Sequence, residues 1–174
     1  MKIGIDIDNT IAPTFKTIIK YMNEKYKTKK KSKHSKKPSG YDLFHSNFNS
    51  FYNDWIEFTV SKDHEEMKPI KGSIKIIKNL SEKHEIYIIT ARANTQKIPT
   101  ILWIDKHYKN KIKEVLFLNY SENNNQKPIY TKGDLCTKFD IDLIIEDDIT
   151  HVYEILEKKP NTIVFLFNKN NQYS

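Results

Sequence analysis

Nine residues near the start of the chain, Lys2-Ile3-Gly4-Ile5-Asp6-Ile7-Asp8-Asn9-Thr10, decide the fold that the sequence predicts. The isoleucines alternate with smaller or polar residues, which is typical of a buried strand. Asp6 and Asp8 are also two positions apart, so a strand through both would place them on one face. At about 5 Å and an effective dielectric constant near 20, two such carboxylates repel by roughly 3 kcal/mol. We therefore expect either a positive group between them or two solvated aspartates in a turn.

The length and composition indicate one globular unit. A chain of 174 residues suits a single domain, and a hydrophobic fraction of 38% is sufficient for a core. No apolar run approaches the roughly 20 residues that span a bilayer, and the acidic start does not resemble a secretory signal. Cys136 is the only cysteine, which excludes an internal disulfide. We expect a cytoplasmic protein without a membrane partner; the oligomeric state is left open.

The positive charge is local. Residues 25–37 hold eight lysines and no acid, and removing those eight charges from the formal net charge of +7 leaves −1. The basic charge is therefore confined to one stretch, and the sequence does not indicate a general nucleic-acid-binding surface. Arg92 is the single arginine in a chain of lysines, and its planar fork binds oxygen pairs in a way that lysine does not.

Apolar periodicity predicts strands and helices in alternation after residue 70. The expected strands are 85–90, 114–119, 141–145 and 161–167, and 121–126 reads as a polar loop. The expected helices are 14–26, one that begins at Ser73, 95–108, 131–139 and 150–158. We expect Thr14 to cap the first of these helices and Ser73 to cap the second. This alternation predicts an α/β fold: a three-layer, Rossmann-like parallel sheet of about five strands.

A long segment separates the first two strands and is too long for one crossover helix. We expect a small helical cap at residues 12–69, inserted into a core of residues 1–11 and 70–174. The cap contains a lysine-rich loop at 27–40 and an aromatic stripe between Phe48 and Phe58. We interpret the loop as solvated and the stripe as the core of the cap.

Polar groups gather where the strands end. Ligands bind beyond the carboxyl ends of parallel strands, and there the chain places Asp6 and Asp8, the segment 90–92 and the acidic segment 146–148. Lys132 lies just before the last of these strands. So many carboxylates call for a divalent cation, and Mg²⁺ is the usual choice where carboxylates and a phosphate share an ion. Thr90, the amides that follow it (Ala91) and Lys132 suit the phosphate oxygens. The set predicts phosphoryl transfer to one aspartate, with a second aspartate as acid and base.

The order and spacing of these motifs resemble the haloacid dehalogenase superfamily of phosphatases. The Asp-x-Asp-x-Thr signature stands as residues 6–10, the strand-and-threonine motif as Ile88-Ile89-Thr90, and the acidic motif as residues 145–148. Residues 89–92, Trp103 and the Ile-Glu-Asp ending are most similar to the cytosolic 5′(3′)-deoxyribonucleotidase type. Asn9 stands where glycine is commoner in the superfamily.

The resemblance implies a role for each matching residue. Asp6 would be the nucleophile, and Asp8 would protonate the leaving oxygen and then activate water. Thr90, Ala91, Arg92 and Lys132 would bind the phosphate; Lys127 and Lys138 are rivals of Lys132, and Arg92 pairs with an acid in the alternative interpretation. Asp6, the Asp8 carbonyl and Asp147 would hold Mg²⁺, with Glu146 or Asp148 in support.

Three functions remain open at this point. The leading hypothesis is a Mg²⁺-dependent phosphomonoesterase that acts on a small phosphate ester, namely a nucleotide. The lysine run favours a second hypothesis, a phosphatase for nucleic-acid ends. A third is a phosphate-binding module without turnover, although Asp8 has no use in such a module. The six histidines lack metal-ligand spacing, and we interpret them as structural.

Overall fold

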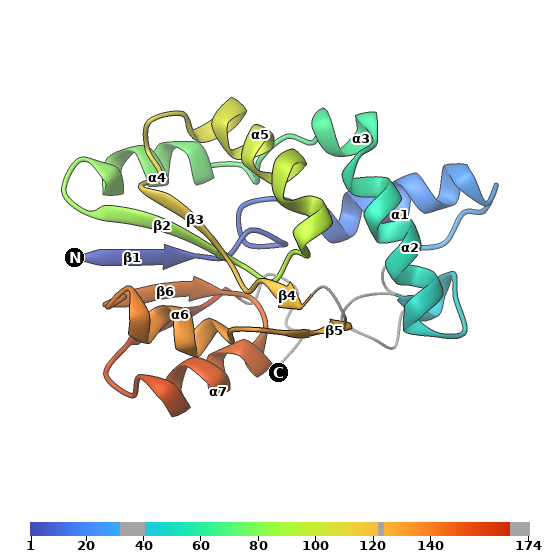
Figure 1. Cartoon of the computed structure of the whole chain (residues 1–174). Helices are drawn as coiled ribbons and strands as arrows, with labels where there is room; N and C mark the ends of the chain where they lie inside the picture. The colour runs from blue at the N-terminus through green and yellow to red at the C-terminus, as the bar shows by residue number, and fades with distance from the viewer. Residues whose placement is uncertain (32–40, 122–123, 168–174) are drawn as a thin grey trace.

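Five parallel strands form the centre of the molecule in a computed structural model, which describes residues 1–31, 41–121 and 124–167 (Figure 1). The order across the sheet is β3-β2-β1-β6-β7. The strands are β1 (Lys2–Ile5), β2 (Glu85–Thr90), β3 (Glu114–Phe117), β6 (Leu143–Glu146) and β7 (Ile163–Leu166). Because β1 lies in the middle, its end has neighbours on both sides. The predicted α/β class is confirmed.

Helices cover both faces of this sheet. Helices α4 (Ser73–Ser81) and α5 (Lys97–Tyr108) lie on one face, and α6 (Lys132–Lys138) and α7 (Ile149–Lys158) lie on the other (Figure 1). Ile88 packs in one buried cluster with Trp103 of α5, whereas Ile89 packs in a second with Leu135 of α6. Successive residues of β2 thus enter opposite layers, which explains the nearly continuous apolar run of this strand.

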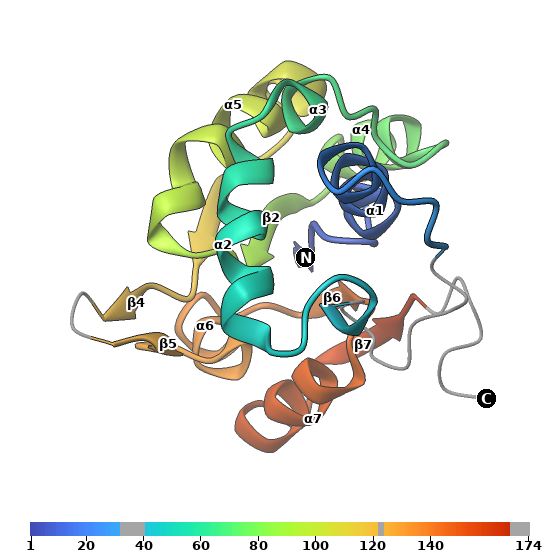
Figure 2. The ribbon, with the colours of Figure 1, turned by 90° about the vertical axis from the view of Figure 1, so that its right-hand side faces the viewer.

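The described part of the inserted segment, residues 12–69, contains three α-helices: α1 (Thr14–Lys25), α2 (Phe48–Thr59) and α3 (Lys62–Glu65). They sit beyond the carboxyl ends of the strands, so the view from that side shows α1 and α2 in front of the sheet (Figure 2). A separate buried cluster of Ile18, Met22, Phe51 and Phe58 holds α1 against α2. The aromatic residues at 51 and 58 are therefore core residues, as expected. The described part of the lysine-rich loop ends at residue 31, so most of it lies outside the described residues.

Strand β1 ends earlier than predicted. Its last residue is Ile5, and the carbonyl of Ile7 accepts backbone hydrogen bonds from Ile11 and Ala12 in a turn. Asn9 has a φ of 61°, a left-handed conformation that glycine and asparagine adopt most readily, so asparagine is a suitable replacement for glycine here. Asp6 and Asp8 therefore lie beyond the last residue of β1 and not within the strand.

Other sequence expectations also need correction. Strands β4 (Tyr120–Ser121) and β5 (Asn124–Pro128) pair in an antiparallel manner, where residues 121–126 were expected to form a polar loop. Thr14 and Ser73 are the first residues of their helices and not caps. On α4, Ile77 is buried but Ile74 and Ile76 are exposed, because the helix contacts the sheet along a narrow face.

Close packing of α6 on α7 positions the residues around Lys132. A Cβ atom on Gly133 would lie 2.3 Å from the carbonyl oxygen of Glu154, so only glycine permits this approach. The neighbouring Lys132 is consequently held against the sheet. In the described parts of the chain, no helix combines the length and the apolar character needed to cross a bilayer.

Candidate active site

Asp6 and Lys132 form a buried ion pair at the end of β1. Lys132 Nζ lies 2.6 Å from Asp6 Oδ1 and 2.5 Å from Glu146 Oε2, and the lysine side chain is 1% exposed. Burial opposes the charge of an ammonium, but the two carboxylates raise the pKa of Lys132 above its usual value. Lys132 is therefore charged, and it contacts Asp6 from helix α6, which covers one face of the sheet.

Helix α6 begins at Lys132 because the preceding residue caps it. The Thr131 hydroxyl accepts from the Asp134 amide at 3.0 Å, and an Asp134 oxygen accepts from the Thr131 amide at 2.9 Å. This reciprocal arrangement is a capping box, which fixes where the helix starts. The cap thus places Lys132 in the first turn, directly beside the sheet.

Three acids crowd around this lysine. Oxygen atoms of Asp6, Glu146 and Asp147 lie within 4.8 Å of one another. Burial, and then the neighbouring charges, raise the pKa of Asp6 to about 7 even though Lys132 lowers it. Burial and the charge of Asp6 raise the pKa of Asp147 to about 7 as well. The site therefore has a surplus of negative charge that one lysine does not compensate.

The three consecutive acids at the end of β6 occupy three different environments. Glu146 is fully buried; its Oε2 faces Lys132, and its Oε1 accepts from the amides of Asp147 and Asp148 at 3.2 and 3.1 Å. Asp148 caps α7, because its Oδ1 accepts from the Thr150 amide at 2.8 Å. Asp147 is half-buried between them. Burial raises the pKa of its carboxyl, and a hydrogen bond with the Asn9 side chain acts in the opposite direction.

Asp8 belongs to a different ion pair. Arg92 Nη2 donates to Asp8 Oδ1 at 2.7 Å and Arg92 Nε donates to Oδ2 at 3.1 Å, a bidentate geometry. The Thr14 hydroxyl donates to the same Oδ1 at 2.5 Å. Burial alone would raise the pKa of Asp8, but the Arg92 charge and these hydrogen bonds hold it below its usual value. Of the two interpretations of Arg92, the structure shows the pairing with an acid.

The remaining predicted residues lie on the loop that follows β2. Thr90 is fully buried, and its hydroxyl accepts from the Arg92 amide at 3.3 Å. Ala91 is half-buried between them. The end of β2 pairs with Phe117 of β3, while β1 lies on its other side, so the loop emerges beside Asp8. Phosphate binding by Thr90 and Ala91 stays a prediction.

The structure separates Lys132 from its described rival. Lys138 lies at the other end of α6, with its ammonium 5.2 Å from the Tyr130 ring centre and 5.8 Å from that of Phe139. The side chain of Lys127 lies outside the described residues. Among the described candidates, Lys132 is thus the lysine beside Asp6.

Two neighbours of Arg92 were missed from the sequence. His64 Nε2 and Thr100 Oγ1 each lie 3.0 Å from Arg92 Nη1. His64 had been interpreted as structural, because a lone histidine 28 positions from Arg92 gives no signal by spacing. Only the fold brings the two together.

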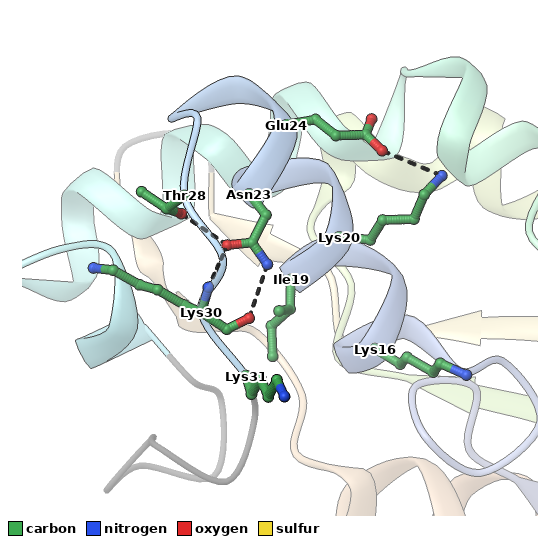
Figure 3. Close-up of a pocket in the computed structure, with 8 residues that line it drawn as sticks. All are labelled: Lys16, Ile19, Lys20, Asn23, Glu24, Thr28, Lys30 and Lys31. Carbon is green, nitrogen blue, oxygen red and sulfur yellow. Dashed lines mark hydrogen bonds and ion pairs between the residues drawn. The ribbon is translucent and has the colours of Figure 1, made fainter.

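A second, basic groove lies along α1 and is separate from these ion pairs. It has a volume of about 500 Å³, and Figure 3 shows the side chains that line it. Lys20 is paired with Glu24 and Asp63 at 3.5 and 3.3 Å, and Lys30 donates to the carbonyl of Leu43. Lys16 and Lys31 are exposed at its edge.

Solved structures with the same fold are hydrolases. The magnesium-bound putative HAD-hydrolase YfnB from Bacillus subtilis is 13% identical, with a TM-score of 0.62 over 99% of this chain and 89% of that one. A haloacid dehalogenase-like hydrolase from Streptococcus pneumoniae is 14% identical, with a TM-score of 0.62 over 90% and 80% of the two chains. The tungstate-bound class C acid phosphatase from Bacillus anthracis is 17% identical, with a TM-score of 0.53 over 95% and 65%. At these identities the likeness shows the fold, which is that of the HAD hydrolases.

The family follows from the sequence itself. Residues 1–121 match the family described as 5′ nucleotidase, deoxy (pyrimidine), cytosolic type C protein. The match extends over more than half of the 174 residues, and the chain belongs to this family. It is therefore a HAD-type enzyme of the phosphatase and nucleotidase class, as the motifs predicted. A comparison with curated proteins finds no match.

Proposed function

We propose that this enzyme is a Mg²⁺-dependent phosphomonoesterase that hydrolyses a nucleoside monophosphate through a phosphate ester of Asp6. The contact between Asp6 and Lys132 at the end of the central strand carries this proposal. It provides a carboxylate for attack and a cation for the phosphate in one place. The family description supports a deoxynucleotide as the substrate and the cytoplasm as the location.

The acidic residues fit a magnesium ion. Asp6, Glu146 and Asp147 with Lys132 carry a net charge of −2 when all are ionised, which suits a divalent cation. All donors are oxygen atoms, as Mg²⁺ prefers, and burial together with the neighbouring negative charges raises the pKa values of Asp6 and Asp147. Asp6, Asp147 and the Asp8 carbonyl would hold the ion, while Glu146 is committed to Lys132. A bound ion supplies charge neutralisation at the phosphate oxygens.

The residues then divide the chemistry into two steps. A carboxylate oxygen of Asp6 attacks phosphorus, the ester bond breaks, and the leaving oxygen takes a proton from Asp8. Water next attacks phosphorus and gives a proton to Asp8 as the bond to Asp6 breaks. Lys132 and Thr90 bind the phosphate oxygens. The negative phosphate raises the pKa of Asp8 when it arrives, which favours the protonated form that the first step needs.

We further propose that residues 12–69 act as a cap over this site. Helices α1 and α2 lie beyond the carboxyl ends of the strands, where the substrate would enter (Figure 2). The nucleoside would contact this segment, because the phosphate-binding groups come from the rest of the chain, the sandwich of sheet and helices within residues 1–11 and 70–174.

A phosphate-release assay over a panel of deoxynucleoside and nucleoside monophosphates tests the proposal. We expect release with Mg²⁺, none with a chelator, and none from Asp6→Asn. Asp105→Asn makes the same change on the exposed face of α5 and should retain wild-type activity. A wild-type enzyme that releases no phosphate from any monoester would refute the proposed function.

The basic groove favours a second substrate, a phosphorylated nucleic-acid end. Lys16 and Lys31 would contact the backbone beyond the terminal phosphate (Figure 3). We expect a Lys16→Gln, Lys31→Gln variant to lose activity on a 5′-phosphorylated oligonucleotide at low salt and to keep it on a mononucleotide. Equal activity of variant and wild type on both substrates leaves the mononucleotide as the substrate.

A further inference from the structure

The guanidinium of Arg92 is almost completely engaged. Two of its N–H groups bind the Asp8 carboxylate, and the two on Nη1 reach His64 Nε2 and Thr100 Oγ1 at 3.0 Å each. Four of the five N–H groups that an arginine carries thus have acceptors. A guanidinium held on both sides has one orientation, and it imposes that orientation on Asp8.

This group of residues is buried. Arg92 is 3% exposed, His64 is 2% and Thr100 is fully buried, whereas the Asp8 side chain is 22% exposed. Burial, together with the Arg92 charge, lowers the pKa of His64 to about 4. The imidazole is therefore neutral near pH 7, and its Nε2 accepts a hydrogen bond from Arg92. Asp8 is the solvent-facing end of a chain of contacts that starts in the interior.

His64 itself is fixed to the sandwich. It lies on α3, at the end of the inserted segment, and its neighbours there bind α5. The Trp103 indole donates to the Met67 carbonyl at 2.7 Å, and Lys106 donates to the Glu65 carbonyl at 2.8 Å. The chain directly after His64 is therefore docked on α5 by two hydrogen bonds.

A second buried contact ties the same loop to the insertion. The Gln96 amide donates to the Thr59 hydroxyl at 2.7 Å, and the Gln96 carbonyl oxygen accepts from the Ala93 amide at 2.8 Å. Thr59 is the last residue of α2. The loop after β2, which carries Arg92, is thus held between the insertion and α5.

We propose that His64 and Thr100 are positioning residues that fix Arg92, and through it the carboxylate of Asp8, so that the inserted segment completes the acid–base machinery of the sandwich. The inference rests on the proposed function. Without His64 and Thr100, Nη1 of Arg92 would lose both of its partners, and the guanidinium could rotate together with the Asp8 carboxylate, away from the reacting oxygen. Misplacement of a catalytic group by about 1 Å costs up to about 100-fold in rate.

The two steps of the reaction offer a specific readout. p-Nitrophenolate leaves without needing a proton, so the first step with p-nitrophenyl phosphate depends little on Asp8. The second step needs Asp8 to accept a proton from water. A misplaced Asp8 therefore predicts that the Asp6 phosphate ester accumulates with this substrate, which appears as a burst of nitrophenolate.

His64→Leu and His64→Gln form the matched pair of variants. Leucine has no acceptor, whereas the glutamine carbonyl oxygen can take the place of Nε2. With p-nitrophenyl phosphate we expect His64→Leu to lower kcat by about tenfold and KM along with it, so that kcat/KM changes little, and to raise the burst toward about one nitrophenolate per enzyme. His64→Gln should restore most of the rate. Thr100→Val, a substitution of similar shape, should show the same change to a smaller extent and serves if His64→Leu does not fold.

The outcomes separate this inference from the proposed function. A wild-type enzyme without phosphatase activity refutes the proposed function before the variants are compared. An active wild type whose folded His64→Leu and Thr100→Val variants keep its kcat and burst refutes the positioning role. Equal loss in His64→Gln and His64→Leu, in step with a lower melting temperature and without a burst, shows a merely structural histidine and also overturns the inference.

Discussion

Two aspartates that are two residues apart have pKa values shifted in opposite directions. Asp6 faces Lys132 and Glu146, which come from α6 and β6, and burial raises its pKa to about 7. Asp8 faces Arg92 and Thr14, and Arg92 keeps its pKa low against the effect of burial. We call these the core group (Asp6, Lys132, Glu146, Asp147) and the joint group (Asp8, Arg92, His64, Thr100).

The difference lies in which parts of the chain build each group. The core group is complete within the sandwich, because α6, the end of β6 and the residues directly after β1 and β6 supply all of it. The joint group needs α3 of the inserted segment in addition to the sandwich. The nucleophile is thus set by the fold, whereas the proposed acid–base residue depends on how the insertion docks. Substitutions in the two groups should therefore have different consequences.

The largest difference is expected between Asp6→Asn and Asp8→Asn. Loss of the attacking oxygen should lower kcat by about 10⁴-fold or more, and no Asp6 ester should form. Asp8→Asn should lower kcat on a nucleotide by about 10³-fold, yet retain a burst with p-nitrophenyl phosphate. Rapid-mixing kinetics measure both. A burst from Asp6→Asn would place the nucleophile elsewhere.

The next effect concerns the core group as a buried ion cluster. Lys132→Met should lower the free energy of unfolding by about 3 kcal/mol, because two carboxylates lose their buried partner. The double variant Lys132→Met, Glu146→Gln should be more stable than Lys132→Met, since one of the stranded charges is gone. Urea unfolding at pH 7 checks both. A double variant that is the sum of the singles would mean that the lysine and Glu146 do not interact.

A third test compares two adjacent acids, Asp147 of the core group and Asp148, which caps α7. Asp147→Asn should raise the Mg²⁺ concentration for half-maximal activity by about tenfold or more, because one oxygen ligand is weakened. Asp148→Asn should leave it unchanged, since asparagine caps a helix as well as aspartate does. Activity titrations with Mg²⁺ measure both values. Equal shifts in the two variants would remove the distinction between ligand and cap.

The smallest effect should come from an ion cluster that lies wholly in the insertion. Asp54 accepts from Lys25, Tyr26 and His45 at 3.0, 2.6 and 3.0 Å, while Glu57 lies against the same lysine. Burial would raise the pKa of Asp54, but these partners lower it. Asp54→Asn should therefore cost about 1–2 kcal/mol of unfolding free energy at pH 7.

The sign of its pH dependence follows from the lowered pKa. The stabilisation by Asp54 is present above the pKa of an unfolded aspartate, about 3.9, and is lost as the pH falls through the folded-state value. The gap between wild type and Asp54→Asn should close below about pH 4. Glu24→Gln, an exposed charge on α1, should change stability by less than about 0.5 kcal/mol. A gap that widens in acid would show that Asp54 is not stabilised as a carboxylate.

The sequence predicted the sheet and the strand ends well for a physical reason. Runs such as 85–90 are apolar on both faces because both are covered, and the polar residues that interrupt them mark one edge of the sheet. Because these residues mark the same edge, the sequence predicted that Asp6, Thr90, Lys132 and Asp147 belong to one site. The early end of β1 and the pairing of β4 with β5 were missed, because both depend on backbone hydrogen bonds that side-chain periodicity does not encode.

The partners of Arg92 were out of reach for another reason. Its rarity made it conspicuous, but neither His64 nor Thr100 stands at a spacing that links it to the arginine. Their contact depends on the docking of α3 against α5, a tertiary event without a local signal. Residues of this kind emerge only when the fold is known.

The indole of Trp103 gives the docking of α3 an optical signal. It is buried at the junction and bound to the Met67 carbonyl, whereas Trp55, the other tryptophan of the chain, lies on α2 within the insertion. A Trp55→Phe variant would retain one tryptophan, at the boundary between the two parts. Its emission would shift to longer wavelength when α3 separates from α5, and it would report that movement independently of catalysis.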